Sequence, residues 1–169
     1  KNREALSSVD CFITDEDYQN SPDNYGLPLH VRHLIDLPIN EDLTYVDILM
    51  FLKSHLKTKS PKYVEIGVSV LKTFYQVANF LEDSELYAFD INTINPTIAK
   101  KFDITQEGPQ VNKYKYNNNK ITHFKGDVFE KKDFDLFKKE VSGDVNIIFS
   151  DAHHTGEGLK AEYDSFVEE

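Results

Sequence analysis

The chain of 169 residues has little of what several classes of protein require. Its single cysteine, Cys11, excludes an internal disulfide framework and is typical of a reducing compartment, so we expect a cytoplasmic protein. No apolar run approaches the roughly 18 residues of a membrane span, and we recognise no signal peptide, so no membrane partner is expected. Lys and Arg number 19 against 29 Asp and Glu, and the net charge of −10 makes a nucleic-acid partner unexpected.

The rest of the composition is that of an ordinary globular domain, with 40% hydrophobic and 28% charged residues. The length suits one domain with a real core. Residues 1–42 show no sustained periodicity, and several prolines and Gly26 interrupt any helix there. We therefore expect an irregular N-terminal arm at 1–42, followed by one α/β domain at 43–169.

Short apolar runs and amphipathic segments alternate along this domain. The runs predict strands at 62–66, 86–89, 121–124 and 145–149, and the amphipathic segments predict helices at 43–57, 71–82, 97–102, 131–141 and 157–167. Alternating strands and helices with short connections are typical of an α/β fold with a Rossmann-like, doubly wound parallel sheet. The polar tract 111–120 is expected to be a solvated loop.

The predicted sheet is expected to lack its last strands. A doubly wound sheet has about six strands, and four are recognised before Glu169. The strand at 145–149 would then present a bare apolar edge, which promotes aggregation. We therefore expect further strands in the full protein, or a partner chain or second copy that covers this edge.

Four acidic residues stand at or just past the ends of the predicted strands: Glu65, Asp90, Asp127 and Asp151. The carboxyl ends of parallel strands border the crevice where ligands of such sheets bind. Four carboxylates suit a ligand with ribose hydroxyls, an amino group and an amine-bearing base, and they suit a pyrophosphate poorly. The pattern favours S-adenosylmethionine over a dinucleotide. A nicotinamide-dependent oxidoreductase is disfavoured further, because only Gly67 remains of the G-x-G-x-x-G fingerprint.

Each of the first three acids has a candidate ligand group and a structural alternative. Glu65 can meet a cationic amino group beside a turn at Gly67, or the two can form an ordinary strand-to-helix turn. Asp90 lies 25 residues after Glu65 and can accept the ribose hydroxyls, or it can cap the turn that follows. Asp127 can accept the exocyclic amine of adenine while Val128 packs on the ring, or it can simply precede a helix, where negative charge is favourable.

Two adjacent histidines, His153 and His154, follow Asp151 directly before the last predicted helix. An imidazole at this place can act as general base towards a substrate hydroxyl, because its pKa lies near neutrality. Either histidine can instead cap the helix or orient a neighbour. Asp151 can also contribute to a divalent metal site with a histidine, although two ligands do not complete one. The remaining histidines are expected to be structural or surface residues: His30, His33, His55 and His123.

The segment from Tyr63 to Tyr163 resembles class I S-adenosylmethionine-dependent methyltransferases. It is most similar to the small-molecule O-methyltransferase branch, whose fourth strand reads I-D-G-x-H-x-Y-E-G-V-x-x-D. The residues that match this motif are Asp151, Ala152, His154, Glu157, Gly158, Leu159 and Glu162. The resemblance implies transfer of a methyl group from S-adenosylmethionine to an oxygen or nitrogen of a small-molecule acceptor.

The resemblance also implies which residues hold the cofactor. They are Glu65, Gly67 and the small Ser69 for the methionine moiety, Asp90 for ribose, Asp127 and Val128 for adenine, and Asp151 and Ala152 beside the transferable methyl group. His154 or His153 would remove the proton of the acceptor, or a metal at Asp151 would acidify it.

Three departures separate this chain from the branch. Val70 and Leu71 stand where a small residue is usual, and their bulk is expected to narrow the cofactor pocket. Gly156 replaces an aromatic residue. In metal-dependent members the strand-four acid is joined by ligands after a fifth strand, so a metal at Asp151 lacks those ligands here. The alternative function is a methyltransferase-like domain that has lost catalysis and serves as a binding or scaffold module.

Overall fold

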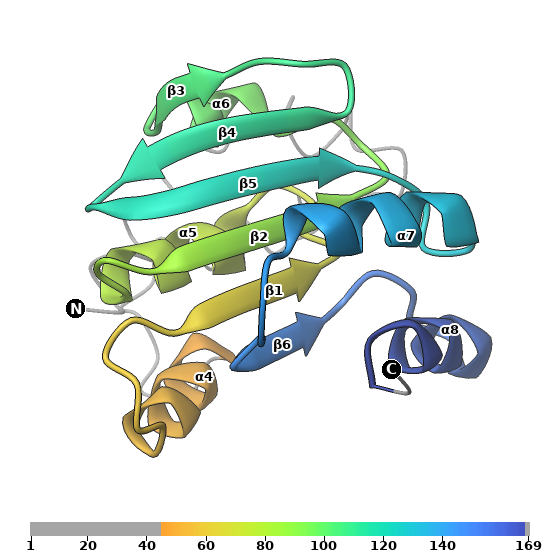
Figure 1. Cartoon of the computed structure of the whole chain (residues 1–169), viewed down its shortest axis with the longest axis horizontal. Helices are drawn as coiled ribbons and strands as arrows, with labels where there is room; N and C mark the ends of the chain where they lie inside the picture. The colour runs from red at the N-terminus through yellow and green to blue at the C-terminus, as the bar shows by residue number, and fades with distance from the viewer. Residues whose placement is uncertain (1–44, 168–169) are drawn as a thin grey trace, which may run out of the picture.

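The computed structural model describes residues 45–167, which form one six-stranded sheet with helices against both of its faces (Figure 1). The strands are β1 (Lys62–Ile66), β2 (Glu85–Asp90), β3 (Asp103–Gln106), β4 (Val111–Tyr116), β5 (Asn119–Lys125) and β6 (Ile147–Ser150). The helices are α4 (Tyr45–Ser54), α5 (Lys72–Phe80), α6 (Pro96–Ala99), α7 (Lys131–Glu140) and α8 (Gly156–Val167). The predicted arm at 1–42, Cys11, His30 and His33 lie outside the described residues.

The strand order is β3-β4-β5-β2-β1-β6. The neighbours β5, β2, β1 and β6 are parallel, whereas β4 pairs antiparallel with β5, and β3 pairs antiparallel with β4. The prediction of an α/β fold is confirmed, and the four predicted strands are these four parallel ones, an arrangement consistent with a Rossmann-like sheet. The prediction of a wholly parallel sheet is wrong, because the sheet is mixed.

The tract 111–120 is not the predicted solvated loop but most of an antiparallel hairpin. Its residues alternate with the period of a strand. Tyr114 is buried in a hydrophobic cluster that also contains residues of α5, and Tyr116, two residues later, packs against this cluster. The turn between β4 and β5 is formed by Asn117 and Asn118, whose φ angles are 48° and 61°. Asparagine is one of the few residues that adopts this conformation readily in two-residue hairpins. The polar composition of the tract therefore hid a strand and its turn.

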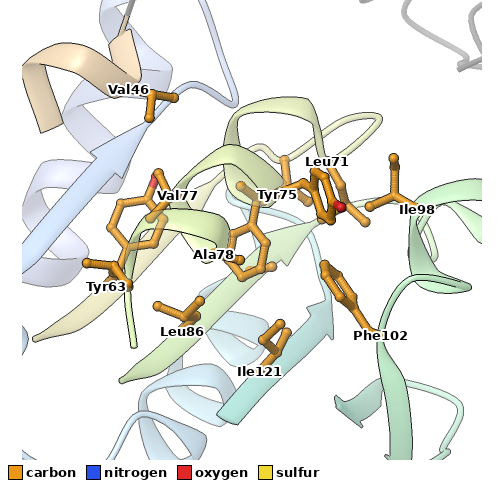
Figure 2. Packing of buried hydrophobic residues seen from close by; sticks show 14 of the residues in the cluster. Val46, Tyr63, Leu71, Tyr75, Val77, Ala78, Leu86, Ile98, Phe102 and Ile121 are labelled. Carbon is orange, nitrogen blue, oxygen red and sulfur yellow. The ribbon is translucent and has the colours of Figure 1, made fainter. Parts of the chain in front are cut away.

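One face of the sheet carries α4, α5 and α6, and the other carries α7. On the first face, a hydrophobic cluster packs α5, through residues such as Val77 and Ala78, onto Leu86 and Ile121 of the sheet (Figure 2). On the other face the ring of Phe89 lies between those of Phe124 and Phe134, with centroids 5.6 and 5.0 Å away. The two faces alternate along each strand, as expected for a strand buried on both sides.

Within residues 45–167, β6 pairs with β1 alone, and its Ile148 is 39% exposed. The expected cover for this edge, a further strand or a partner, stays a prediction. Of the helices in the same range, none has the length and apolar character that crossing a membrane would require.

Candidate functional site

A pocket of about 290 Å³ lies at the carboxyl ends of the four parallel strands. Among its lining residues are nine of the ten that the sequence predicted for the site: Gly67, Ser69, Asp90, Asp127, Val128, Asp151, Ala152, His153 and His154. These residues are spread over nearly ninety positions of the chain, and the strand order β5-β2-β1-β6 brings them together. The crevice predicted from the strand ends is therefore present as one concave surface.

The sequence reasoning missed four lining residues: Phe89, Ile91, Asn92 and Gly126. Each of them is within two positions of a predicted acid, Asp90 or Asp127. The signal that would have found them is geometric, because the last residue of a strand and the first residues after it border the same crevice. Ile91 is 52% exposed and adds an apolar wall to a pocket otherwise rich in carboxylates.

Asp90 is a nearly buried carboxylate that joins two loops of the pocket. Its Oδ2 accepts the backbone N–H of Ser69 at 2.8 Å, and its Oδ1 accepts that of Asn92 at 2.8 Å. Burial raises the pKa of Asp90, and these hydrogen bonds oppose that rise. The alternative prediction, that Asp90 caps the following turn, is thus confirmed. A carboxylate has about four acceptor positions, so hydroxyl groups of a ligand can still bind.

Gly67 is required by the approach of two loops. Its φ of +83° is one that L side chains rarely adopt, and its N–H donates to the carbonyl of Phe89 at 2.8 Å. A Cβ atom at this position would meet the backbone of Ala152 and lie 2.6 Å from the carbonyl carbon of Asp151. The glycine therefore allows the β1–α5 loop to touch the β6–α8 loop directly beneath the pocket.

Val70 and Leu71 do not narrow the pocket, and that expectation is wrong. Both side chains are buried in the hydrophobic cluster on the α5 face, with Leu71 fully buried. Neither lines the pocket. Leu71 has a φ of 66°, which turns the chain from the loop into α5 and directs the side chain inward.

Asp127 is held in a local turn. Its Oδ1 accepts the N–H of Phe129 at 2.9 Å, and its own N–H donates to Oδ2 of Asp133 at 3.0 Å. This arrangement matches the structural alternative, a turn at the start of a helix. Asp127, which carries a second carboxylate oxygen, and the neighbouring Val128 both line the pocket.

The histidine pair divides between two neighbours. The Nε2 atom of His154 lies 3.6 Å from Oδ1 of Asp151, and both side chains are about half exposed. The ring of His153 instead meets that of Phe129 edge to face, with centroids 4.6 Å apart. Partial burial raises the pKa of Asp151, and the nearby His154 lowers it. Of the two histidines, His154 is the one that faces a carboxylate of the pocket.

Glu65 is the predicted site residue that does not line the pocket. It precedes the last residue of β1, so its side chain points between the sheet and α5, where it is 2% exposed. Its Oε2 accepts the hydroxyl of Tyr63 at 2.5 Å. Burial raises the pKa of Glu65 to about 8, and the hydrogen bond from Tyr63 opposes the rise.

Two of the histidines that were expected to be structural or surface residues, His55 and His123, lie within the described residues. His123 is structural, since it is 1% exposed on β5. Burial lowers its pKa to about 4. His55 is an exposed residue beside Phe51, with ring centroids 4.6 Å apart. Both fit the prediction of structural or surface roles.

Asp151 is not part of a metal-binding cluster within residues 45–167. No group of three or more His, Cys, Asp or Glu side chains in this range is arranged to hold a metal ion. A metal at Asp151 therefore stays a prediction, with His154 the nearest candidate ligand beside it. Comparison of the chain with protein families, with curated proteins and with solved structures found no match.

Proposed function

We propose that this chain is an S-adenosylmethionine-dependent methyltransferase acting on an oxygen or nitrogen of a small molecule. The observation that carries the proposal is the convergence of nine predicted residues on one pocket at the ends of four parallel strands. Crevices of this kind are the usual ligand site of open α/β sheets.

The polar and apolar groups of the pocket fit the parts of such a cofactor. The remaining acceptor positions of Asp90 suit ribose hydroxyls, and the second oxygen of Asp127 suits an exocyclic amine. Val128 and Ile91 supply apolar surface for a base. The charge of Asp151 favours a cationic ligand at the opposite end of the pocket.

When bound, S-adenosylmethionine supplies an electrophilic methyl group on a sulfonium centre. The protein then has to orient an acceptor atom and remove its proton. His154 is placed to take that proton, because it lines the pocket and faces Asp151, whose negative charge stabilises the imidazolium that results. His153, whose ring meets Phe129, forms part of the wall.

The experiment is calorimetric titration of the full chain with S-adenosylhomocysteine. We expect measurable binding, and we expect Asp90→Ala to weaken it by about 10- to 100-fold, as for the loss of hydrogen bonds to a charged group worth roughly 1.5–3 kcal/mol. Asp90→Asn keeps one acceptor oxygen for the loops, so its affinity for S-adenosylhomocysteine should lie between those of the unchanged chain and of Asp90→Ala. Asp144→Ala, which removes an exposed acid on the loop before β6, is the control and should bind as the unchanged chain does.

A methyltransferase-like scaffold without catalysis is the second candidate. Two observations favour it: both oxygens of Asp90 already accept backbone N–H groups, and the loops at Gly67 and Ala152 are in contact. A folded chain that gives no binding heat with either S-adenosylmethionine or S-adenosylhomocysteine would support the scaffold and exclude the methyltransferase. Binding that depends on Asp90 would exclude a scaffold with a blocked pocket.

A further inference from the structure

The helix α8 contacts His153 through two residues that lie one turn apart on the same face, Gly158 and Glu162. The helix begins immediately after the pair: Thr155 precedes it, and the Oγ1 of Thr155 accepts the N–H of Gly158 at 3.1 Å. This bond is that of an N-cap. The start of the helix is therefore set by the residue that follows His154.

Gly158 brings the helix backbone against His153. A Cβ atom added at this glycine would collide with the Cβ of His153 and come within 3.1 Å of its Cγ. The conformation of Gly158 is ordinary for a helix, so the glycine is explained by this close approach. Any larger residue would push His153 away from α8.

Glu162 holds the backbone of the same histidine. Its side chain is 3% exposed, and its carboxylate accepts the backbone N–H of His153. The Oε1 atom of Glu162 is buried without a hydrogen-bond partner within the described part of the chain. A buried carboxylate with an unused oxygen is costly and calls for an explanation other than stability.

The charged groups that face Glu162 are those of the candidate site. His153 and His154 favour its ionised form and Asp151 opposes it, while burial raises the pKa of Glu162 above its ordinary value. Glu162 thus lies within electrostatic reach of the pair formed by His154 and Asp151, although it does not line the pocket. In its ionised form Glu162 adds its negative charge to that of Asp151 beside the two histidines.

We infer that Glu162 is a positioning residue of the site: by holding the backbone of His153 against α8, it directs His154 towards Asp151. The role of His154 as base rests on the proposed function, whereas the hold on His153 does not. Glu162 does not line the pocket, so it acts through the histidines and touches no ligand.

The test follows the His153 amide and the His154 ring by nuclear magnetic resonance in the full chain. An amide that donates to a carboxylate changes its shift when that carboxylate takes a proton, so the His153 amide should titrate with Glu162. Glu162→Gln should abolish this titration yet keep the His154 ring signals, because its amide oxygen still accepts the N–H. Glu162→Ala should shift the ring signals of His154.

Gly158→Ala serves as the second variant, since it displaces His153 by steric contact and leaves every charge in place. It should shift the His154 ring signals as Glu162→Ala does. Glu157→Gln, at an exposed position in the first turn of the same helix, is the control and should change neither signal. Unchanged His154 signals in both Glu162→Ala and Gly158→Ala would overturn the inference.

The two proposals fail separately. If S-adenosylhomocysteine does not bind but the His154 ring responds to Glu162→Ala, the positioning stands and the methyltransferase does not. If the ligand binds and the ring does not respond, only the positioning role is lost.

Discussion

Two buried titratable side chains, Glu65 and His123, lie in the same row across the sheet, with Ala88 between them. Both point to the α5 face, and burial disfavours the charged form of each. The pKa of Glu65 is raised to about 8 and that of His123 is lowered to about 4. Between these values both groups are uncharged in the folded chain. The row therefore joins β1, β2 and β5 without placing a charge in the core.

The two groups affect stability with opposite signs. The folded state binds the proton of Glu65 more tightly than the unfolded chain does, so this group makes stability fall as the pH rises from about 4.5 to about 8. His123 is neutral when folded and can be charged when unfolded, so it makes stability rise between about 4 and 6.5. Above pH 6.5 only the effect of Glu65 remains of the two.

Glu65→Gln should flatten the fall in stability between pH 6.5 and 8. The span of about 1.5 pH units corresponds to roughly 2 kcal/mol for one carboxyl group. Urea unfolding of the unchanged chain and of the variant at both pH values measures the difference. Glu85→Gln is the control, because the pKa of Glu85 is lowered by Lys62 and Tyr87 and its carboxylate stays ionised in this range. An equal slope in the unchanged chain and Glu65→Gln would show that Glu65 is already charged at pH 6.5.

At the scale of elements, the hairpin of β4 and β5 is fastened to α5 by Asn119. Its side chain is fully buried: Oδ1 accepts the N–H of Ser84 at 3.0 Å, and Nδ2 donates to the carbonyls of Ala78 and Leu81 at 3.0 and 2.8 Å. One amide thus satisfies three backbone groups at the end of α5 and the start of β2. Nearby, the hydroxyl of Tyr116 lies 3.1 Å from that of Tyr75 on α5.

Asn119→Ala should destabilise the fold by about 2–4 kcal/mol, because it leaves buried backbone groups without partners. Thermal or urea unfolding measures the loss. The neighbouring Asn118→Gly is the control: Asn118 is exposed with a φ of 61°, a conformation that glycine adopts without strain. That variant should be neutral. A similar loss in both variants would assign the effect to the turn and not to the hydrogen bonds.

The strands differ in whether the sequence alone could predict them. Apolar runs bounded by turns predicted β1, β2, β5 and β6, because each strand contains a short apolar run. β1, β2 and β5 are buried on both faces, whereas only Ile147 is buried in the edge strand β6. The strand β4 was missed, since it carries two lysines and only one buried residue, Tyr114. β3 has no buried residue to signal it. β3 depends on pairing with β4, and β4 on pairing with β5, and no local pattern reveals either pairing.

The site was predicted for the same physical reason as the strands. Acids that follow the last residue of a strand reach the crevice, as Asp127 and Asp151 do. Asp90 is itself the last residue of β2 and still borders it. Glu65 stands one residue earlier in its strand and pairs with Ala88, two residues before Asp90, so it lies deeper in the sheet, under α5. The sequence identified Glu162 only as a match to the methyltransferase motif, because its hydrogen bond with the backbone of His153 is a tertiary contact.

At the scale of the whole molecule, the sheet is unevenly buried. β2 lies between β1 and β5 with five of its six residues buried, whereas all four residues of β3 at the outer edge are exposed. The pocket lies over β5, β2, β1 and β6 and includes no residue of β3 or β4. The antiparallel edge can therefore open without disturbing the candidate site.

Native-state hydrogen exchange should separate these two parts of the sheet. Exchange of an amide in a central strand requires global unfolding, whereas an exposed edge opens locally at a much smaller free energy. We expect amides of β1 and β2 to exchange slowest, with rates that rise steeply as urea is added. Amides of β3 should exchange faster and respond weakly to urea, since local opening exposes little surface. Equal protection in β2 and β3, with the same urea dependence, would mean that the six strands unfold as one unit. The pocket would then be lost whenever the β3 edge of the sheet opens.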